Sequence, residues 1–190
     1  TIDDPSPVNY PDPGGEERGR SLATGLTEAQ RNEILEFIDK AWDEENGGWS
    51  KSKFVDGTML IWALQRARQG DAVNTARIKK VLTLMANTMI DKTGALDQVN
   101  LKPDWSAPAH EYPMFAQEAA LAAYSRAWTM FGDPAYKQAA DRIFGFLRDK
   151  MPAPGGGFYA SYGMSEGEPG VDRRVYARET AQAVAGLLAY

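Results

Sequence analysis

Three amphipathic segments of the chain each run into a loop that joins glycine to an apolar residue. These loops are Gly47-Gly48-Trp49, Gly94-Ala95-Leu96 and Gly155-Gly156-Gly157-Phe158-Tyr159. A shorter joint alternates with them, because Arg66-Ala67 precedes Gly70-Asp71 and Arg126-Ala127 precedes Gly132-Asp133-Pro134. Helical hairpins that recur in this way bury their faces against neighbouring copies. The pattern therefore predicts a solenoid or a closed ring of helices.

The composition of the chain excludes several classes of protein. The chain has 190 residues, 43% of them hydrophobic, which is enough for one sizeable core. A net charge of −5 disfavours a nucleic-acid partner, since phosphate binding needs a basic face. No apolar run is long enough to suggest a membrane span. The chain contains no cysteine, which excludes disulfides, a thiol nucleophile and cysteine-based metal sites, so we expect no cofactor.

The chain divides into two parts by composition. Residues 1–25 carry four prolines and a Gly14-Gly15 pair among few apolar residues, so we expect an extended arm or linker there. Residues 26–190 are expected to form the helical domain. The first residue, Thr1, is not an initiator methionine and indicates processing or a partial chain. Together with the lack of cysteine, this slightly favours an exported or periplasmic location over a cytoplasmic one.

Helix signals recur along the second part. Thr27 and Gln30 form a capping pair for a first helix, and further helices are expected from Asp56 to Gly70, over 71–90, over 113–131, from Asp133-Pro134, and from near Arg174. The fourth of these helices is expected to turn Met114, Leu121, Tyr124 and Trp128 inward. The last helix carries an apolar face, made by Val184, Leu187 and Leu188, that continues to the last residues of the sequence.

The loops between these helices differ in length. The joints at Gly70 and Gly132 are tight, whereas residues 43–55, 91–112 and 150–173 form long connections, which must all lie at one end of the helices. Long loops on a rigid scaffold commonly bind ligands, so that end is the expected functional face.

Several separate motifs carry a resemblance to a known family. They are residues 41–49, Lys53-Phe54, Trp105 with Pro108, Glu111 and Gln117, residues 156–159, and residues 171–179. Over residues ~26–190 the chain resembles the helical domain of the thioredoxin-like, spermatogenesis-associated protein family. The resemblance implies an all-α, partial (α/α)6 toroid of about three hairpins, similar to N-acylglucosamine 2-epimerases and six-hairpin glycosidases.

The chain departs from that family at two motifs. Where the family carries His-Phe-Glu-Lys, this chain reads Ala109-His110-Glu111-Tyr112, and Ser161 is followed by Tyr162 instead of a Gln-Asp-Ala-Asp run. The thioredoxin domain is also absent. These differences favour a non-catalytic binding or scaffolding subunit whose partners are other proteins, such as a membrane-bound complex. A redox or folding accessory module is a further alternative, although without cysteine it could only bind.

The alternative from another class is a carbohydrate-active enzyme of the epimerase or glycosidase type. His110, the only histidine, could transfer protons, although packing in the loop is the simpler interpretation. It lacks partners for a transition metal, so we expect no metal site. Glu111 could pair with Asp97 or Glu179 as acid and base. Glu179 could instead form an ion pair with Arg174 or Arg178.

Other residues are candidates for binding a ligand or partner. Aromatic side chains can stack on sugar rings or partner surfaces, and the alternative is that they plug the ring and pack the glycine turns. The candidates are Trp49, Lys53, Trp105, Tyr112, Gln117, Phe158 and Tyr159. The glycine runs are turns, because no Lys-Ser/Thr follows them as in a phosphate loop. Residues 165–172 lack the ligand spacing of a calcium loop and are expected to be a solvated loop.

Overall fold

A computed structural model of the chain describes residues 25–165 and 168–190. The predicted arm over 1–25 lies outside the described residues except for Gly25. The described residues divide into two units after Lys40, and the second unit begins at Ala41. In the first unit, helix α1 (Glu28–Ala41) begins with the predicted capping pair. The Gln30 amide donates to the Thr27 hydroxyl over 3.2 Å, and the Thr27 amide donates to Gln30 Oε1 over 2.9 Å.

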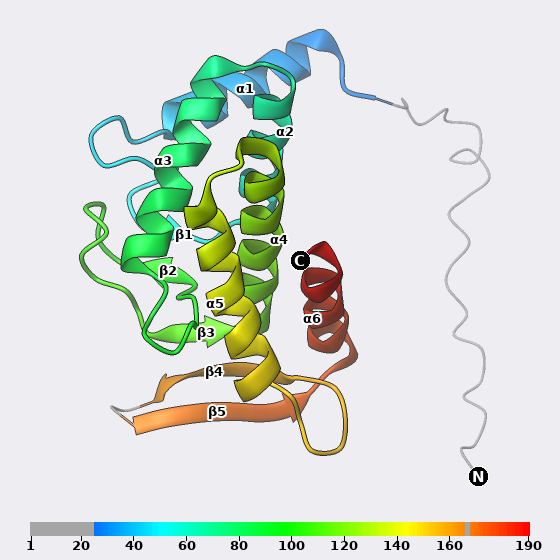
Figure 1. Ribbon diagram of the computed structural model, residues 1–190. Coiled ribbons are helices and arrows are strands. Elements are labelled where there is room, and N and C mark those ends of the chain that lie inside the picture. Colours follow the sequence, from blue (N-terminus) through cyan, green and yellow to red (C-terminus); the bar gives the residue numbers. More distant parts are fainter. Residues whose placement is uncertain (1–24, 166–167) are drawn as a thin grey trace, which may run out of the picture. The chain divides into compact units, whose positions relative to one another are not determined.

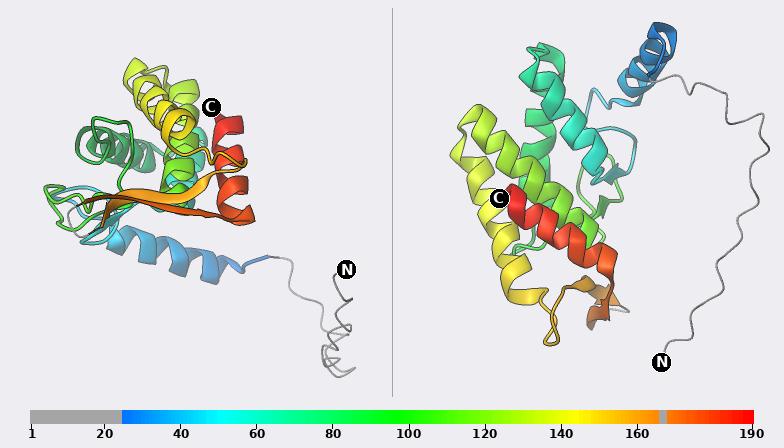
Figure 2. Two further views of the ribbon diagram at one scale, coloured as in Figure 1. Left: turned by 90° about the horizontal axis from the view of Figure 1, so that it is seen from below. Right: turned by 90° about the vertical axis from the view of Figure 1, so that its right-hand side faces the viewer.

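The second unit is built from helical hairpins. Its helices are α2 (Gly57–Arg68), α3 (Ala72–Thr88), α4 (Met114–Phe131), α5 (Pro134–Lys150) and α6 (Ala177–Ala189). Helix α4 packs against α2 and α6, while α3 packs on α2 and α5 packs on α4 (Figures 1 and 2). Helices α2, α4 and α6 thus form one layer, with α3 and α5 on a second layer. This is the predicted α/α arrangement, with short strands added at one end.

Helix α4 is central because its sequence allows neighbours on nearly every side. Eleven of its residues are buried, and six of these are alanines, whose small side chains let adjacent helices approach closely. Tyr124 in its middle is fully buried, and its hydroxyl donates to the Leu82 carbonyl over 2.8 Å. The predicted orientation is confirmed for Met114, Leu121 and Tyr124. It is wrong for Trp128, which is 41% exposed and lies under the Lys137 ammonium.

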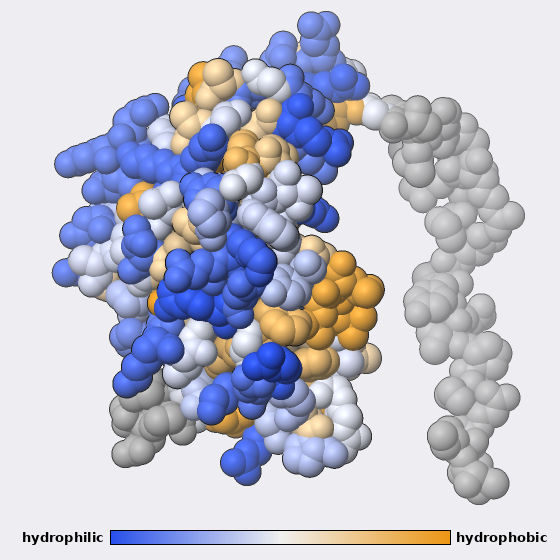
Figure 3. Space-filling model, viewed as in Figure 1, coloured by the Kyte–Doolittle hydropathy of each residue, from blue (hydrophilic) through white to orange (hydrophobic). Residues whose placement is uncertain are grey.

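The helix ends agree closely with the predicted signals. Asp56, Asp71 and Asp133 each accept a hydrogen bond from a backbone amide in the first turn of the helix that follows. Helix α6 begins at Ala177 and not near Arg174, because residues 168–175 are paired in a sheet. Its Val184 and Leu188 are exposed, the latter by 84%, and an apolar patch covers this helix in Figure 3. None of the described helices is long and apolar enough to cross a membrane.

The long connections 91–112 and 150–173 contain short strands and lie together at one end of the second unit, as predicted (Figure 1). The connection over 43–55 begins beside the middle of α3, where the Lys80 ammonium donates to the Glu45 carbonyl over 3.3 Å, and joins the other two only at its strand. Strand β1 (Lys53–Phe54) pairs with β2 (Val99–Asn100). Strands β3 (Glu111–Pro113), β4 (Tyr159–Ser165) and β5 (Glu168–Val175) form an antiparallel sheet in that order. Tyr112 lies opposite Tyr162, and Ser161 lies opposite Asp172. The prediction of a loop over 165–172 was therefore wrong, because β5 occupies most of it.

Candidate functional site

A cavity of about 600 Å³ opens on the three-stranded sheet at the loop end. Strand β3 contributes Glu111 and Tyr112, while β4 and β5 contribute the facing pair Ser161 and Asp172. Its full lining is Gln98, Glu111, Tyr112, Pro113, Ser161, Tyr162, Gly163, Gly170, Val171, Asp172 and Arg174. The lining combines hydrogen-bond donors and acceptors with two tyrosine side chains, a mixture suited to a polar ligand.

A buried carboxylate, Asp97, and the single histidine, His110, meet at the start of β3, each one residue before a residue of the cavity lining but not in that lining themselves. The His110 Nδ1 atom lies 3.8 Å from Asp97 Oδ2 and 3.4 Å from the Tyr112 hydroxyl. Asp97 is held in place from both sides, since its own amide donates to the Met89 carbonyl and its Oδ1 accepts the Glu111 amide over 3.0 Å. The Asp97 side chain is 2% exposed and that of His110 is 55% exposed. The histidine ring therefore faces solvent on one side and the buried acid on the other.

The environment of Asp97 changes its acidity. Burial raises the pKa of Asp97 from 3.8 to about 6, against the opposing effects of the Glu111 amide and of His110. Burial and the nearby Asp97 and Asp91 carboxylates also raise the pKa of the Tyr112 hydroxyl. An acid with a pKa close to neutral, beside a histidine and a cavity, is the usual arrangement of a proton-transfer site.

His110 reaches this position through an unusual backbone conformation. Its φ is +60°, in the left-handed region that residues other than glycine seldom adopt. The β2 and β3 segments fix this turn, because the Gln98 amide donates to the Glu111 carbonyl over 2.9 Å. The sheet thus holds a strained residue where its ring meets Asp97.

The predicted acid–base partners of Glu111 are only partly brought together. The Glu111 amide contacts Asp97, and its carboxylate accepts from the Gln98 side-chain amide at the cavity. Glu179 lies in the first turn of α6, and its Oε2 atom is buried without a hydrogen-bond partner among the described residues. The alternative of an ion pair with Arg174 is not realised, since Arg174 pairs with Asp172. That pairing lowers the pKa of the Asp172 carboxyl.

Lys53 and Gln117 form hydrogen bonds in the interior of the fold. The Lys53 ammonium is buried and donates to Asp43 Oδ2 and to the Ser50 carbonyl, each over 2.7 Å. The Gln117 side chain is also buried, accepting the Leu96 amide over 2.9 Å and donating to the Leu96 carbonyl over 2.6 Å. Both side chains hold long loops onto the helices, so neither faces a ligand.

The aromatic candidates mostly pack the glycine turns. Trp105 is buried, its Nε1 donates to the Asn46 carbonyl over 3.1 Å, and a Cβ on Gly48 would lie 2.9 Å from its ring. Trp49 meets the edge of Trp42 with 5.3 Å between ring centroids. Phe158 and Tyr159 are half-buried against the core. These positions fit the packing alternative better than sugar stacking.

Nine of the eleven cavity residues were not singled out from the sequence as site residues, and the polar or aromatic ones among them are Gln98, Ser161, Tyr162, Asp172 and Arg174. The available signal was the β-branched and aromatic content around Tyr162 and Val171, which favours strands. No group of three or more acidic or histidine side chains suited to a metal ion occurs within the described residues.

The fold places the second unit in the class of α/α toroids, which includes glycoside hydrolases and sugar epimerases. A family 76 glycoside hydrolase from a bovine Bacteroides thetaiotaomicron strain superposes with a TM-score of 0.69 and 13% identity, over 85% of this chain and 37% of that chain. The cellobiose 2-epimerase of Spirochaeta thermophila gives a TM-score of 0.66 and 16% identity, over 82% and 45%. At such identities the likeness shows the fold.

One curated relative is similar in sequence. Human spermatogenesis-associated protein 20 is 27% identical over an alignment of 138 positions that covers 68% of this chain and 18% of that protein. No family model matches the chain. The predicted resemblance to the helical domain of this family is confirmed by the sequence match and the toroid fold together. The chain spans less than half of each of these similar proteins.

Proposed function

We propose that this chain forms part of a carbohydrate-active protein of the epimerase or glycosidase type, with its site at the loop end. The observation that carries the proposal is Asp97, a buried acid with a pKa of about 6, held 3.8 Å from His110, whose neighbour in the sequence, Glu111, lines a polar cavity. The toroid fold supports it, because the similar solved structures are a glycoside hydrolase and a cellobiose 2-epimerase.

In this proposal His110 exchanges a proton with the sugar. Asp97 lies against Nδ1 and orients the ring, so that Nε2 is the atom that gives or takes the proton. The Glu111 carboxylate, exposed at the cavity and bonded to Gln98, is the second acid–base group. Two such groups are what proton transfer on opposite sides of a sugar requires.

The rest of the cavity would bind hydroxyl groups. Ser161, Gln98 and Arg174 can donate hydrogen bonds, and Asp172 accepts them. A cavity of about 600 Å³ lies in the usual range of small-molecule sites. A ligand rich in hydroxyls satisfies this lining better than an apolar one.

The test uses cellobiose and α-1,6-mannotriose as probes with the full chain. We expect a saturable change in the ligand NMR spectrum, and product formation that falls about 100-fold in His110→Gln and in Glu111→Gln. Glu45→Gln, on an exposed loop residue outside the cavity, is the matched control and should behave as wild type. The proposal would be contradicted if neither cellobiose nor α-1,6-mannotriose binds, or if both variants keep full activity.

The predicted scaffolding role remains a prediction that the comparisons do not support. It expects Glu111→Gln to leave function intact and the chain to co-purify with other proteins. The Glu111 variant therefore separates the two interpretations directly.

A further inference from the structure

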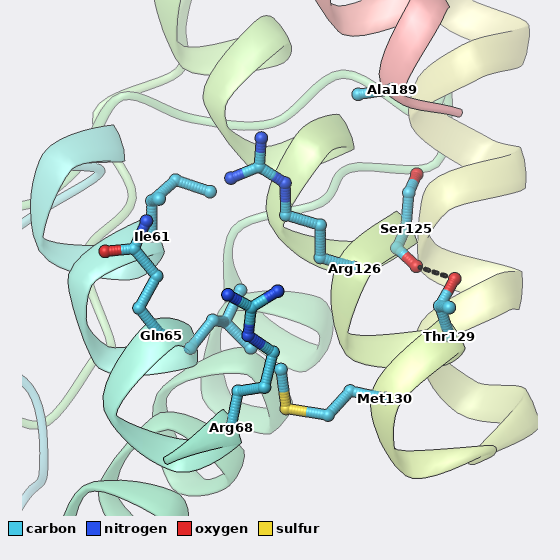
Figure 4. Close-up of a pocket in the computed structure, with 9 residues that line it drawn as sticks. Ile61, Gln65, Arg68, Ser125, Arg126, Thr129, Met130 and Ala189 are labelled. Carbon is cyan, nitrogen blue, oxygen red and sulfur yellow. Dashed lines mark hydrogen bonds between the residues drawn. The ribbon is translucent and has the colours of Figure 1, made fainter.

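A second cavity, of about 640 Å³, lies at the end of the helices opposite the strands. It is formed by the C-terminal halves of α2 and α4 and by the last residue of α6 (Figure 4). Apolar surface predominates in its wall and comes from Ile61, Leu64, Met130 and Ala189. The tight joint after Arg68 places this cavity far along the helices from His110, so it is separate from the candidate site.

Two arginines border this cavity. Arg68 reaches from α2 and Arg126 reaches from α4 into the space between these two helices (Figure 4). Both side chains are exposed, and neither makes a hydrogen bond or ion pair with any residue that the structure describes. Burial raises the pKa of the Glu118 carboxyl, and the charge of Arg126 only partly opposes this rise.

Other arginines of this unit are used within the fold. Arg66, two residues before Arg68, pairs with Asp71 over 2.8 Å. Arg142 donates to the carbonyls of Ile90 and Asp91 over 3.0 and 2.7 Å. The two cavity arginines therefore differ in keeping their guanidinium groups available, and guanidinium groups bind carboxylates and phosphates in bidentate fashion.

The hydroxyl groups of the cavity wall do not compete for a ligand. Ser125 Oγ donates to the Leu121 carbonyl over 2.7 Å, and Thr129 Oγ1 donates to the Ser125 carbonyl over 3.0 Å. Both bonds lie within α4. The cavity thus presents an apolar wall with cationic groups at its border.

We propose that this cavity binds a small organic anion with an apolar body. Its carboxylate or phosphate is bound by Arg68 and Arg126, and its apolar part lies against Ile61, Leu64 and Met130. The anionic end of such a molecule matches the two arginines, and its apolar end matches the apolar wall. A volume of about 640 Å³ lies in the usual range of small-molecule sites. The proposal is independent of the sugar site.

The experiment titrates the full chain with dodecanoate, with dodecyl phosphate and with the uncharged dodecyl maltoside, all below their micellar concentrations, by calorimetry. We expect one equivalent of at least one anion to bind at least tenfold more tightly than the maltoside, and the tighter anion identifies the head group. Arg68→Gln and Arg126→Gln should each weaken that binding about tenfold or more. Arg173→Gln, an exposed arginine on β5, is the matched control and should leave it unchanged.

A second pair of variants tests the apolar part. Ala189→Trp places a large ring in the cavity and should abolish binding, whereas Ala185→Trp, at an exposed position of the same helix, should not. Circular dichroism confirms that each variant is folded. Equal affinity for the maltoside and the anions, no effect of either arginine change, or no binding at all would overturn the proposal.

Discussion

Replacing Asp97 by asparagine should stabilise the protein at neutral pH and remove part of its pH dependence. The side chain is 2% exposed, and the folded chain raises its pKa from 3.8 to about 6. Asparagine keeps the carbonyl oxygen that accepts the Glu111 amide. The substitution therefore removes the buried charge and retains the acceptor.

The magnitude follows from proton linkage. Because the folded state binds this proton more tightly than the unfolded state, the native chain holds more protons between pH 3.8 and about 6. The free energy of unfolding of the wild type therefore falls as the pH rises through this window and levels off above it. The gap between 3.8 and about 6 corresponds to about 3 kcal/mol. Asp97→Asn should be more stable than the wild type by up to that amount at pH 7.5.

Urea unfolding of both proteins, followed by circular dichroism at half-unit steps from pH 4 to pH 7.5, measures this difference. The two free-energy curves should meet near pH 4 and diverge as the pH rises. Asp104→Asn is the control, because Asp104 is exposed and hydrogen bonds to Ser106 lower its pKa, so it titrates below this window. An asparagine variant with the same slope as the wild type, or lower stability at pH 7.5, would refute the reasoning.

Two further predictions concern the fold. Gly94 and Gly132 both have positive φ, of +91° and +69°, but a Cβ at Gly94 would overlap a carbonyl oxygen of α5, whereas Gly132 faces open space. Gly94→Ala should therefore lower stability by about 3 kcal/mol and Gly132→Ala by about 1 kcal/mol, and equal losses in thermal melts would contradict this account. Lys53→Met leaves Asp43 without its buried ammonium partner and should cost about 3 kcal/mol in urea unfolding, whereas the exposed Lys51→Met should change stability little. A loss at Lys53 no larger than at Lys51 would argue against a structural role for that ion pair.

Much of the fold was predictable because its signals are local. Asp56, Asp71 and Asp133 cap the helices that follow them, and their side chains bond to amides two or three residues away. The apolar spacing of α3 and α5 likewise depends on the turn of one helix. Trp128 is the exception, since its position fits the same spacing but its side chain stays 41% exposed beneath the Lys137 ammonium of α5.

The strands were missed because their pairing is not local. Strand β4 pairs with β3, whose residues lie about fifty positions earlier. Strand β5 pairs with β4 in turn, and its residues 168–175 delay the start of α6. Gly163 and Gly170 face each other across the β4–β5 ladder, and glycine weakens the sequence signal for a strand.

The sequence by itself determined the hairpin repeat, most of the helix starts and the alternation of tight joints with long connections, since caps, turns and periodicity act over a few residues. Only the tertiary structure decided what those loops hold. Asp97 and His110 are named by the sequence, but their proximity requires the β2 and β3 segments to meet, and the pKa of about 6 requires many atoms to exclude water from one carboxylate. The same holds for Arg68 and Arg126, which border one cavity because α2 packs on α4. Burial and proximity of this kind are properties of the packed chain, which no short stretch of residues encodes.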